Sequence, residues 1–110
     1  MTITIYLDPP VAYANPRNQT VAETAKASFF CNSTSSPGSV VWSRVDGSNL
    51  SSNALVANGI LRLISIDSGM SGQYQCTVRN QAGEDTVTVE LIVIGIAIFL
   101  FLSYDDSNIA

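Results

Sequence analysis

Apolar and polar residues alternate with a period of two in three parts of the chain, a pattern typical of strands with one buried face. The alternation covers residues 27–31 and 85–91, and Phe30 is the one apolar residue on the polar face of the first range. Within residues 60–64, Leu61 and Leu63 share one face with Arg62 between them, although Ile60 and Ile64 are also apolar. The pattern predicts three strands that each turn one face toward a core. The expected inward-facing residues are Ala27, Phe29, Cys31, Leu61, Leu63, Val87, Val89 and Leu91.

Prolines punctuate the segment before the first of these strands, at Pro9-Pro10 and Asn15-Pro16. Proline has no N–H group to donate to a strand ladder, so a strand in this segment is an edge strand with a break. We expect its two halves at residues 11–13 and 20–23.

Polar and turn-forming residues separate the remaining strands. A polar loop at residues 33–39 leads into a strand from which Val40 and Trp42 point inward. Asp46-Gly47 is a strong turn signal after that strand. The Ser- and Asn-rich residues 49–53 are too polar for a core strand, so we expect only two short strand pieces there.

The last crossing begins at residues 67–69 and leads to a strand at residues 73–79. Residues 80–83 predict a hairpin turn into the final strand. Together, these elements predict an all-β chain.

A second pattern is the spacing of Cys31, Trp42, Tyr74 and Cys76. Trp42 lies eleven residues after the first cysteine, and Tyr74 lies two residues before the second. With these four residues, the sequence resembles the I-set domains of the immunoglobulin superfamily, as repeated in perlecan, hemicentin and related matrix or adhesion proteins. The resemblance covers residues 9–93. Further matching residues are Leu61, Leu63, Ile66, Gly72, the run Trp42 to Gly47, the run Gly59 to Leu63 and the run Asn80 to Gly83.

The resemblance implies an immunoglobulin-like Greek-key β-sandwich of the I-set type, with two antiparallel sheets. It also implies a disulfide between Cys31 and Cys76, with Trp42 packed against the sulfurs and the Tyr74 hydroxyl holding the corner before the second cysteine. Such a bridge stabilises the fold by about 4 kcal/mol on the chain-entropy model.

One pair of residues departs from the family pattern. The usual Asp six residues before the second cysteine is Met70 here, and its usual Arg partner is replaced by Leu55. Because both charges are absent, no buried charge is left without a partner. We expect Met70 and Leu55 to lie near one another on the apolar side.

The length of 110 residues accommodates one domain. We expect an N-terminal extension at residues 1–8, the immunoglobulin-like domain at residues 9–94, and an apolar then acidic tail at residues 95–110. The first eight residues lack the features of a signal peptide, which for an extracellular fold suggests a fragment or an incomplete gene model.

Twelve consecutive apolar residues, Leu91 to Leu102, run through the end of the last strand into the tail. A membrane-spanning helix needs about 20 residues, and acidic residues follow the run where a cytoplasmic flank usually carries Lys or Arg. The run is either an extension of the strand with an additional tail or the start of a truncated membrane anchor, so contact with a membrane is left open.

The net charge of −4 and the isoelectric point near 4.3 argue against nucleic acid as a partner, since a nucleic-acid binder needs a basic face. The five basic residues are scattered along the sequence. A compact heparin site is therefore disfavoured, although Arg44, Arg62 and Arg79 could approach one another in the fold.

The sequence contains no histidine, which excludes a histidine-based triad, acid, base or metal site. The candidate carboxylate pairs are Glu84 with Asp85 and Asp105 with Asp106, and both are typical of solvated surface charge. Two cysteines without a third ligand or a base are better explained as a bridge than as a metal site or nucleophile. We therefore expect no enzyme activity, no cofactor and no metal.

Three N-glycosylation sequons are present, at Asn18, Asn32 and Asn49. Each is expected at a strand end or in a loop, and we expect one or two to be used. Ser68-Gly69 and Ser71-Gly72 are weak candidates for glycosaminoglycan attachment, because they lack an acidic cluster.

These observations predict a non-catalytic module, extracellular or at the cell surface, that makes protein–protein contacts in matrix or cell adhesion. Its expected partners are other extracellular proteins or neighbouring immunoglobulin repeats. The alternatives are a fragment of a membrane-anchored immunoglobulin-like receptor and a purely structural spacer repeat.

Overall fold

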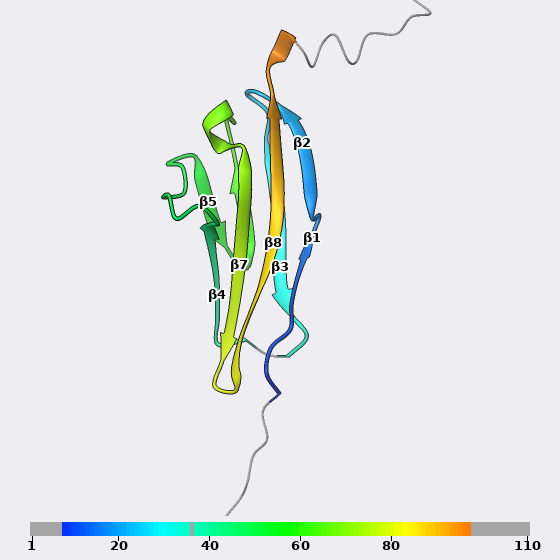
Figure 1. Cartoon of the computed structure of the whole chain (residues 1–110), viewed down its shortest axis with the longest axis vertical. Helices are drawn as coiled ribbons and strands as arrows, with labels where there is room; N and C mark the ends of the chain where they lie inside the picture. Colours follow the sequence, from blue (N-terminus) through cyan, green and yellow to red (C-terminus); the bar gives the residue numbers. More distant parts are fainter. Residues whose placement is uncertain (1–7, 36, 98–110) are drawn as a thin grey trace, which may run out of the picture.

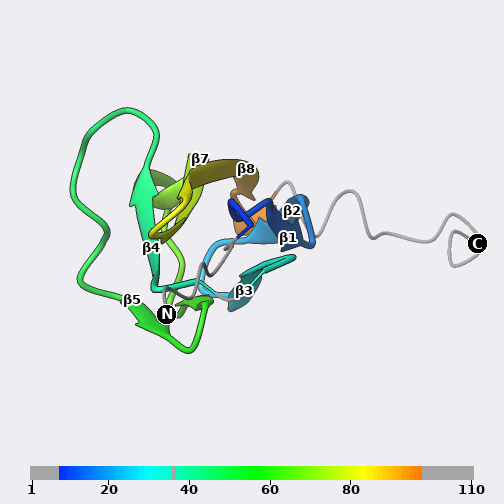
Figure 2. The ribbon, with the colours of Figure 1, turned by 90° about the horizontal axis from the view of Figure 1, so that it is seen from below.

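The computed structural model describes residues 8–35 and 37–97 and contains two four-stranded sheets packed face to face (Figure 1). Figure 2, seen along the strands, separates the sheets, with β3 and β5 in one layer and β7 and β8 in the other. The all-β sandwich predicted from the sequence is therefore confirmed. The strands are β1 (Ala12–Asn15), β2 (Asn18–Ala22), β3 (Ala27–Ser33), β4 (Ser39–Arg44), β5 (Ala54–Ala57), β6 (Ile60–Leu63), β7 (Gly72–Asn80) and β8 (Gly83–Ile94), with a short 3-10 helix η1 (Ser68–Met70) before β7.

The first sheet has the order β1-β3-β6-β5 and the second β2-β8-β7-β4. Neighbouring strands are antiparallel, except that β2 runs parallel to β8. The chain passes from β1 in one sheet to β2 in the other through the cis peptide bond Asn15–Pro16. The sequence correctly predicted a broken edge strand, and its two halves lie at the edges of different sheets.

Side chains alternate between the core and the solvent as the sequence pattern predicted. In β3 the pattern is buried, exposed, buried, exposed, buried from Ala27 to Cys31, and Phe30 is 39% exposed on the outer face. Within the described residues, 14 buried apolar residues form one cluster between the sheets. Its largest fully buried side chains are Tyr74, Phe29, Leu61, Leu63, Ile66, Met70 and Leu91.

The segment between β4 and β5 contains no strand, so the expectation of two short strands within residues 49–53 is wrong. Polar side chains there bind the nearby backbone in place of a neighbouring strand. The carboxylate of Asp46 accepts the backbone N–H and the hydroxyl of Ser48, and the hydroxyl of Ser51 accepts the N–H of Asn53. As a result, β5 begins only at Ala54 and β4 is an edge strand.

A tight turn at Asn58-Gly59 joins β5 to β6, and both residues have positive φ angles of 52° and 79°. Consecutive positive φ angles are typical of the type I′ hairpin turn, which favours Asn-Gly. A Cβ atom at Gly59 would collide with the carbonyl oxygen of Cys31. The glycine therefore allows the turn to pack directly against β3.

Candidate functional site

The disulfide between Cys31 of β3 and Cys76 of β7 joins the two sheets through the core. Their Cα atoms are 6.5 Å apart, within the usual range for a bridge, and both residues are buried. Both cysteines are therefore bonded to each other, and their role is to stabilise the fold.

Trp42 lies beside this bridge, because it pairs directly with Cys76 across β4 and β7. Its ring centroid is 6.3 Å from that of Phe29 in the opposite sheet. The indole Nε1 donates to the carbonyl oxygen of Gly59 at 3.0 Å, in the β5–β6 turn. Trp42 thus ties the second sheet to the turn of the first.

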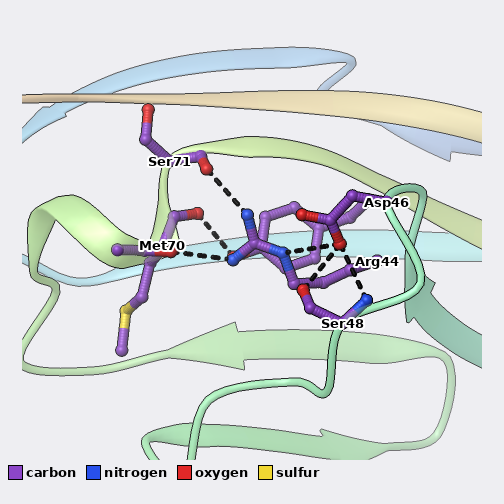
Figure 3. A network of polar contacts seen from close by, with 7 residues as sticks. Arg44, Asp46, Ser48, Met70 and Ser71 are labelled. Atoms are coloured by element: carbon purple, nitrogen blue, oxygen red, sulfur yellow. Dashed lines mark hydrogen bonds and ion pairs between the residues drawn. The ribbon is translucent and has the colours of Figure 1, made fainter.

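Arg44 lies at the corner where η1 leads into β7 (Figure 3), and Tyr74 forms hydrogen bonds in the same corner. The Tyr74 hydroxyl donates to the carbonyl oxygen of Met70 at 2.5 Å. Arg44 donates from Nη1 to the carbonyl oxygen of Gly69 at 3.0 Å and to the Tyr74 hydroxyl at 3.3 Å, and from Nη2 to the carbonyl oxygen of Ser71 at 2.8 Å. Its guanidinium carbon also lies 4.9 Å from the centroid of the Tyr74 ring.

Two ionisable side chains of this corner, Tyr74 and Asp46, have shifted pKa values. Burial raises the pKa of Tyr74 above its ordinary value of 10.0, and the positive charge of Arg44 opposes the shift. Hydrogen bonds from the Ser48 hydroxyl and backbone hold the pKa of Asp46 below its ordinary value. Because Arg44 binds backbone carbonyls, its role here is structural, and no pattern in the sequence predicts this role.

The structure corrects the expectation for Met70 and Leu55. Met70 is buried, with 1% exposure, whereas Leu55 is 56% exposed. Leu55 pairs with Arg62, which points outward between the inward-facing Leu61 and Leu63. The two residues therefore do not share an apolar environment, and Figure 3 shows the Met70 side chain directed away from Arg44.

The three arginines that could have formed a basic cluster are also separated. Arg44 and Arg79 lie at opposite ends of the β4–β7 pair, and Arg62 belongs to the other sheet. Arg79 forms an ion pair with Glu84 at 2.5 Å across the β7–β8 hairpin. These arginines do not create a basic face.

The acidic pair Glu84 and Asp85 does not form a catalytic arrangement. Glu84 binds Arg79, and Asp85 accepts the backbone N–H of Ala12 at 2.7 Å. Asp105 and Asp106 lie outside the described residues. Within residues 8–35 and 37–97, no three His, Cys, Asp or Glu side chains are grouped so that they could hold a metal ion.

The outer face of the β2-β8-β7-β4 sheet carries short polar side chains in ordered rows. One row is Val41, Thr77 and Thr86, and the next is Ser43, Gln75 and Thr88. The hydroxyls of Thr77 and Thr86 are 3.2 Å apart and hydrogen-bonded, and Val41 is 54% exposed at the edge strand. The centre of this face therefore carries no charge.

The three sequon asparagines lie at different places in the fold. Asn18 is the exposed first residue of β2, and Asn49 is exposed in the loop after β4. Asn32 is half-buried near the end of β3. The Ser71 hydroxyl donates to the carbonyl oxygen of Leu91 and accepts the N–H of Val93, so this glycosaminoglycan candidate is engaged within the fold, while Ser68 is exposed.

The sequence of this chain matches a known protein family and known relatives. A family model described as an immunoglobulin domain matches residues 9–80. The chain belongs to the immunoglobulin domain family. This immunoglobulin domain is 34% identical over 87 residues to the basement membrane-specific heparan sulfate proteoglycan core protein of Mus musculus, and 33% identical over 91 residues to hemicentin-1 of Homo sapiens.

These alignments cover 78% and 77% of the chain but only 2% of each relative. Among solved structures, the immunoglobulin domain is similar to Dscam1 isoform 1.9, described as its N-terminal four Ig domains, with a TM-score of 0.67 and 31% identity. That match covers 78% of this chain and 21% of the other. The ectodomain of mouse nectin-like molecule 4 shares the fold, with a TM-score of 0.70, 24% identity and coverage of 80% and 31%.

The expected resemblance to immunoglobulin repeats of matrix and adhesion proteins is thus confirmed. Within the described part of the chain, the structure contains no helix with the length and apolar character needed to cross a membrane.

Proposed function

We propose that this immunoglobulin domain is a non-catalytic extracellular module that binds other proteins in matrix or cell adhesion. The outer face of the β2-β8-β7-β4 sheet is the observation that carries the proposal. We place the module at residues 9–94, with residues 1–8 and 95–110 outside it.

This face suits protein contact because its centre can be dehydrated at little cost. Interface cores are depleted of charged residues, since a charge that loses water needs a partner. Here, the hydroxyls of Thr77 and Thr86 form a hydrogen bond with one another, and Val41 adds exposed apolar area at the edge. The ion pair of Arg79 and Glu84 lies at one end of this face, and Glu90 lies toward the other end, beyond Thr88.

The extracellular location is supported by two chemical features and by the relatives. A disulfide such as Cys31–Cys76 forms and persists in oxidising compartments. Asn18 and Asn49 are exposed sequon asparagines that can accept a glycan there. The name of one relative places that protein in basement membranes.

The proposal is tested by measuring binding of the full secreted chain to an array of extracellular domains, including immunoglobulin repeats. We expect Thr77→Arg, at the centre of the face, to weaken each interaction at least tenfold, or about 1.4 kcal/mol. Ser28→Arg is the matched control, because Ser28 is exposed on the outer face of the other sheet. Binding that is unaffected by Thr77→Arg but lost in Ser28→Arg would assign the contact to the other sheet.

A second candidate function, a spacer repeat, is favoured by the positions of the chain ends. Figure 1 shows the described chain beginning below β1 and leaving above β8, at opposite ends of the long axis. Adjacent repeats joined in this way would line up end to end. A chain that binds no extracellular domain but adds a constant length per repeat in tandem proteins would support the spacer function instead.

A further inference from the structure

Two aromatic rings lie together on the outer face of the β1-β3-β6-β5 sheet. The ring centroids of Tyr13 and Phe30 are 6.5 Å apart, and the planes are tilted by 57°. Tyr13 is 46% exposed and Phe30 is 39% exposed. Ile60 pairs with Phe30 on the neighbouring strand, so the apolar surface continues across β6. Contiguous apolar surface of this kind is where ligands and partners bind when it is functional.

Asn32 lies at the edge of this aromatic surface. It is two residues after Phe30 in β3, so both side chains point to the same face of the sheet. It also pairs directly with Tyr13 across β1 and β3. One sequon asparagine is therefore next to both exposed rings.

The amide group of Asn32 is oriented so that its nitrogen can react. Its Oδ1 accepts the backbone N–H of Ser33 at 2.8 Å. Among the described residues, Nδ2 has no hydrogen-bond partner, and it is not buried. Thr34, which completes the sequon, is exposed.

We propose that Asn32 carries an N-linked glycan whose first N-acetylglucosamine packs on the rings of Phe30 and Tyr13. The inference rests on the proposed extracellular location. Nδ2 loses a proton and forms a bond to the anomeric carbon of the sugar. The bond between that carbon and the diphosphate of a lipid-linked oligosaccharide breaks, the diphosphate leaves with the electron pair, and the proton passes to a base of the transferase.

Packing of the sugar on the rings follows from the chemistry of both surfaces. One side of a pyranose ring presents C–H groups, which are weakly positive, and the face of an aromatic ring is negative. The contact removes apolar area of both from water. The glycan is then an integral part of this sheet face, and it occupies the surface that a protein would otherwise reach.

The other two sequons lack this environment and provide internal controls. Asn18 pairs with Glu90 across β2 and β8, and Asn49 lies in a polar loop between Ser48 and Leu50. A glycan at either position would extend into water without contacting exposed rings.

The test uses the full chain secreted from mammalian cells, with site occupancy measured by mass spectrometry of its peptides. Thr34→Ala removes the sequon but leaves Asn32 and the rings in place. The melting temperature is compared for the wild type, Thr34→Ala, Phe30→Ser and the double variant. Tyr13→Ser replaces Phe30→Ser if that variant does not fold. Asn49→Gln is the control for loss of a glycan elsewhere, and bacterial protein without glycans is the control for the Thr34 side chain.

We expect Asn32 to be occupied and Thr34→Ala to lower the melting temperature by about 4 °C. This loss should disappear in the Phe30→Ser background and in bacterial protein, and Asn49→Gln alone should cause no comparable loss. Trimming the glycan to its first sugar should leave the melting temperature unchanged, because only that sugar contacts the rings.

An equal loss with and without Phe30 would overturn the proposed contact. If Asn18 or Asn49 carries a glycan and Asn32 does not, the proposed Asn32 glycan is rejected and the aromatic surface is left open to a protein. The proposed extracellular location would still stand. A secreted chain without a glycan on any of the three asparagines would also reject it. A chain that cannot be secreted would contradict the proposed location itself.

Discussion

Arg44 stabilises the corner between η1 and β7 through contacts with the backbone and with Tyr74. Its guanidinium binds the carbonyl oxygens of Gly69 and Ser71 and lies over Tyr74. Arg44 shares the parity of Trp42 in β4, so it points toward the inner face of the sheet at the end of the strand. The corner therefore needs no acid at position 70.

Replacing Arg44 with Met should destabilise the domain by about 1–3 kcal/mol. The substitution keeps most of the aliphatic volume but removes the hydrogen bonds to two backbone carbonyls and the Tyr74 hydroxyl. Arg62→Met is the matched control, because Arg62 is exposed, and its change should stay within about 0.5 kcal/mol. Urea denaturation measures both, and equal values would show that the Arg44 contacts contribute nothing to stability.

Tyr74→Phe should make the stability less dependent on alkaline pH. The folded-state pKa of Tyr74 is raised above 10.0, so the folded state holds its proton more tightly than the unfolded state. The stabilisation that comes from this raised pKa is fully present below pH 10 and is lost as the pH rises through the folded-state pKa of Tyr74. The phenylalanine variant should be weaker by about 1 kcal/mol at pH 7 through loss of the bond to Met70.

Denaturation curves between pH 8 and 11 test this expectation. The wild type should lose stability above pH 10 more steeply than the variant, and Tyr13 is present in both proteins. Parallel curves would mean that Tyr74 ionises as in the unfolded chain.

Met70→Asp should destabilise the domain by about 1–3 kcal/mol, because a buried side chain gains a polar group without a partner. Adding Leu55→Arg should not restore stability, since Leu55 is exposed and faces away from the core. Leu55→Arg alone should be nearly neutral. Recovery in the double variant, measured by chemical denaturation, would show that the two positions communicate after all.

Individual residues of the core could be predicted from the sequence to the extent that strand parity determines their direction. Cys31, Trp42 and Tyr74 share this property, and all are buried. The contacts of Arg44 could not be predicted, because they depend on the path of the backbone at Gly69 and Ser71 in a distant crossing. Leu55 was misplaced because alignment to a family pattern cannot fix the register of so short a strand.

At the level of elements, the long alternating strands were predicted within a few residues. The prediction of short strands in the segment after β4 was wrong, because Asp46 and Ser51 direct the backbone into local turns. The Asn-Gly pair at residues 58–59 is a turn signal in the sequence, and both residues adopt positive φ angles in the hairpin. The parallel pairing of β2 with β8 requires knowing which sheet receives the chain after Pro16, which periodicity does not specify.

A chain that ends at Gly95 should keep the stability of the full chain and be more soluble. β8 continues to Ile94, whose carbonyl oxygen accepts the N–H of Glu23 at 2.9 Å, so a cut at Val93 would remove a bond of the sheet. Beyond Gly95, the sequence adds an apolar, β-prone segment, a type that promotes aggregation.

Melting temperature and soluble yield measure the two effects separately. An unfolded product after truncation at Gly95 would show that the tail belongs to the core. The matched chain ending at Val93 should melt lower than the chain ending at Gly95.

At the scale of the whole molecule, the two sheets offer surfaces of different chemistry. The proposed contact face is polar and uncharged around Thr77, whereas the opposite face carries the aromatic rings beside Asn32. The sequence predicted a protein-binding module, but not which face would serve. That distinction depends on the register between strands, which brings Thr77 to Thr86 and Tyr13 to Asn32.

The parallel pairing of β2 with β8 determines how the domain would respond to mechanical tension. Force applied at the two ends pulls β2 and β8 in opposite directions along their common axis. This force loads the β2–β8 pairing in shear, so its bonds bear the load all at once instead of one after another. The loaded set comprises the five paired positions of β2 and β8 and the flanking bonds from Glu90 to Arg17 and from Glu23 to Ile94. An array of such domains under traction would extend only when this whole set of bonds breaks.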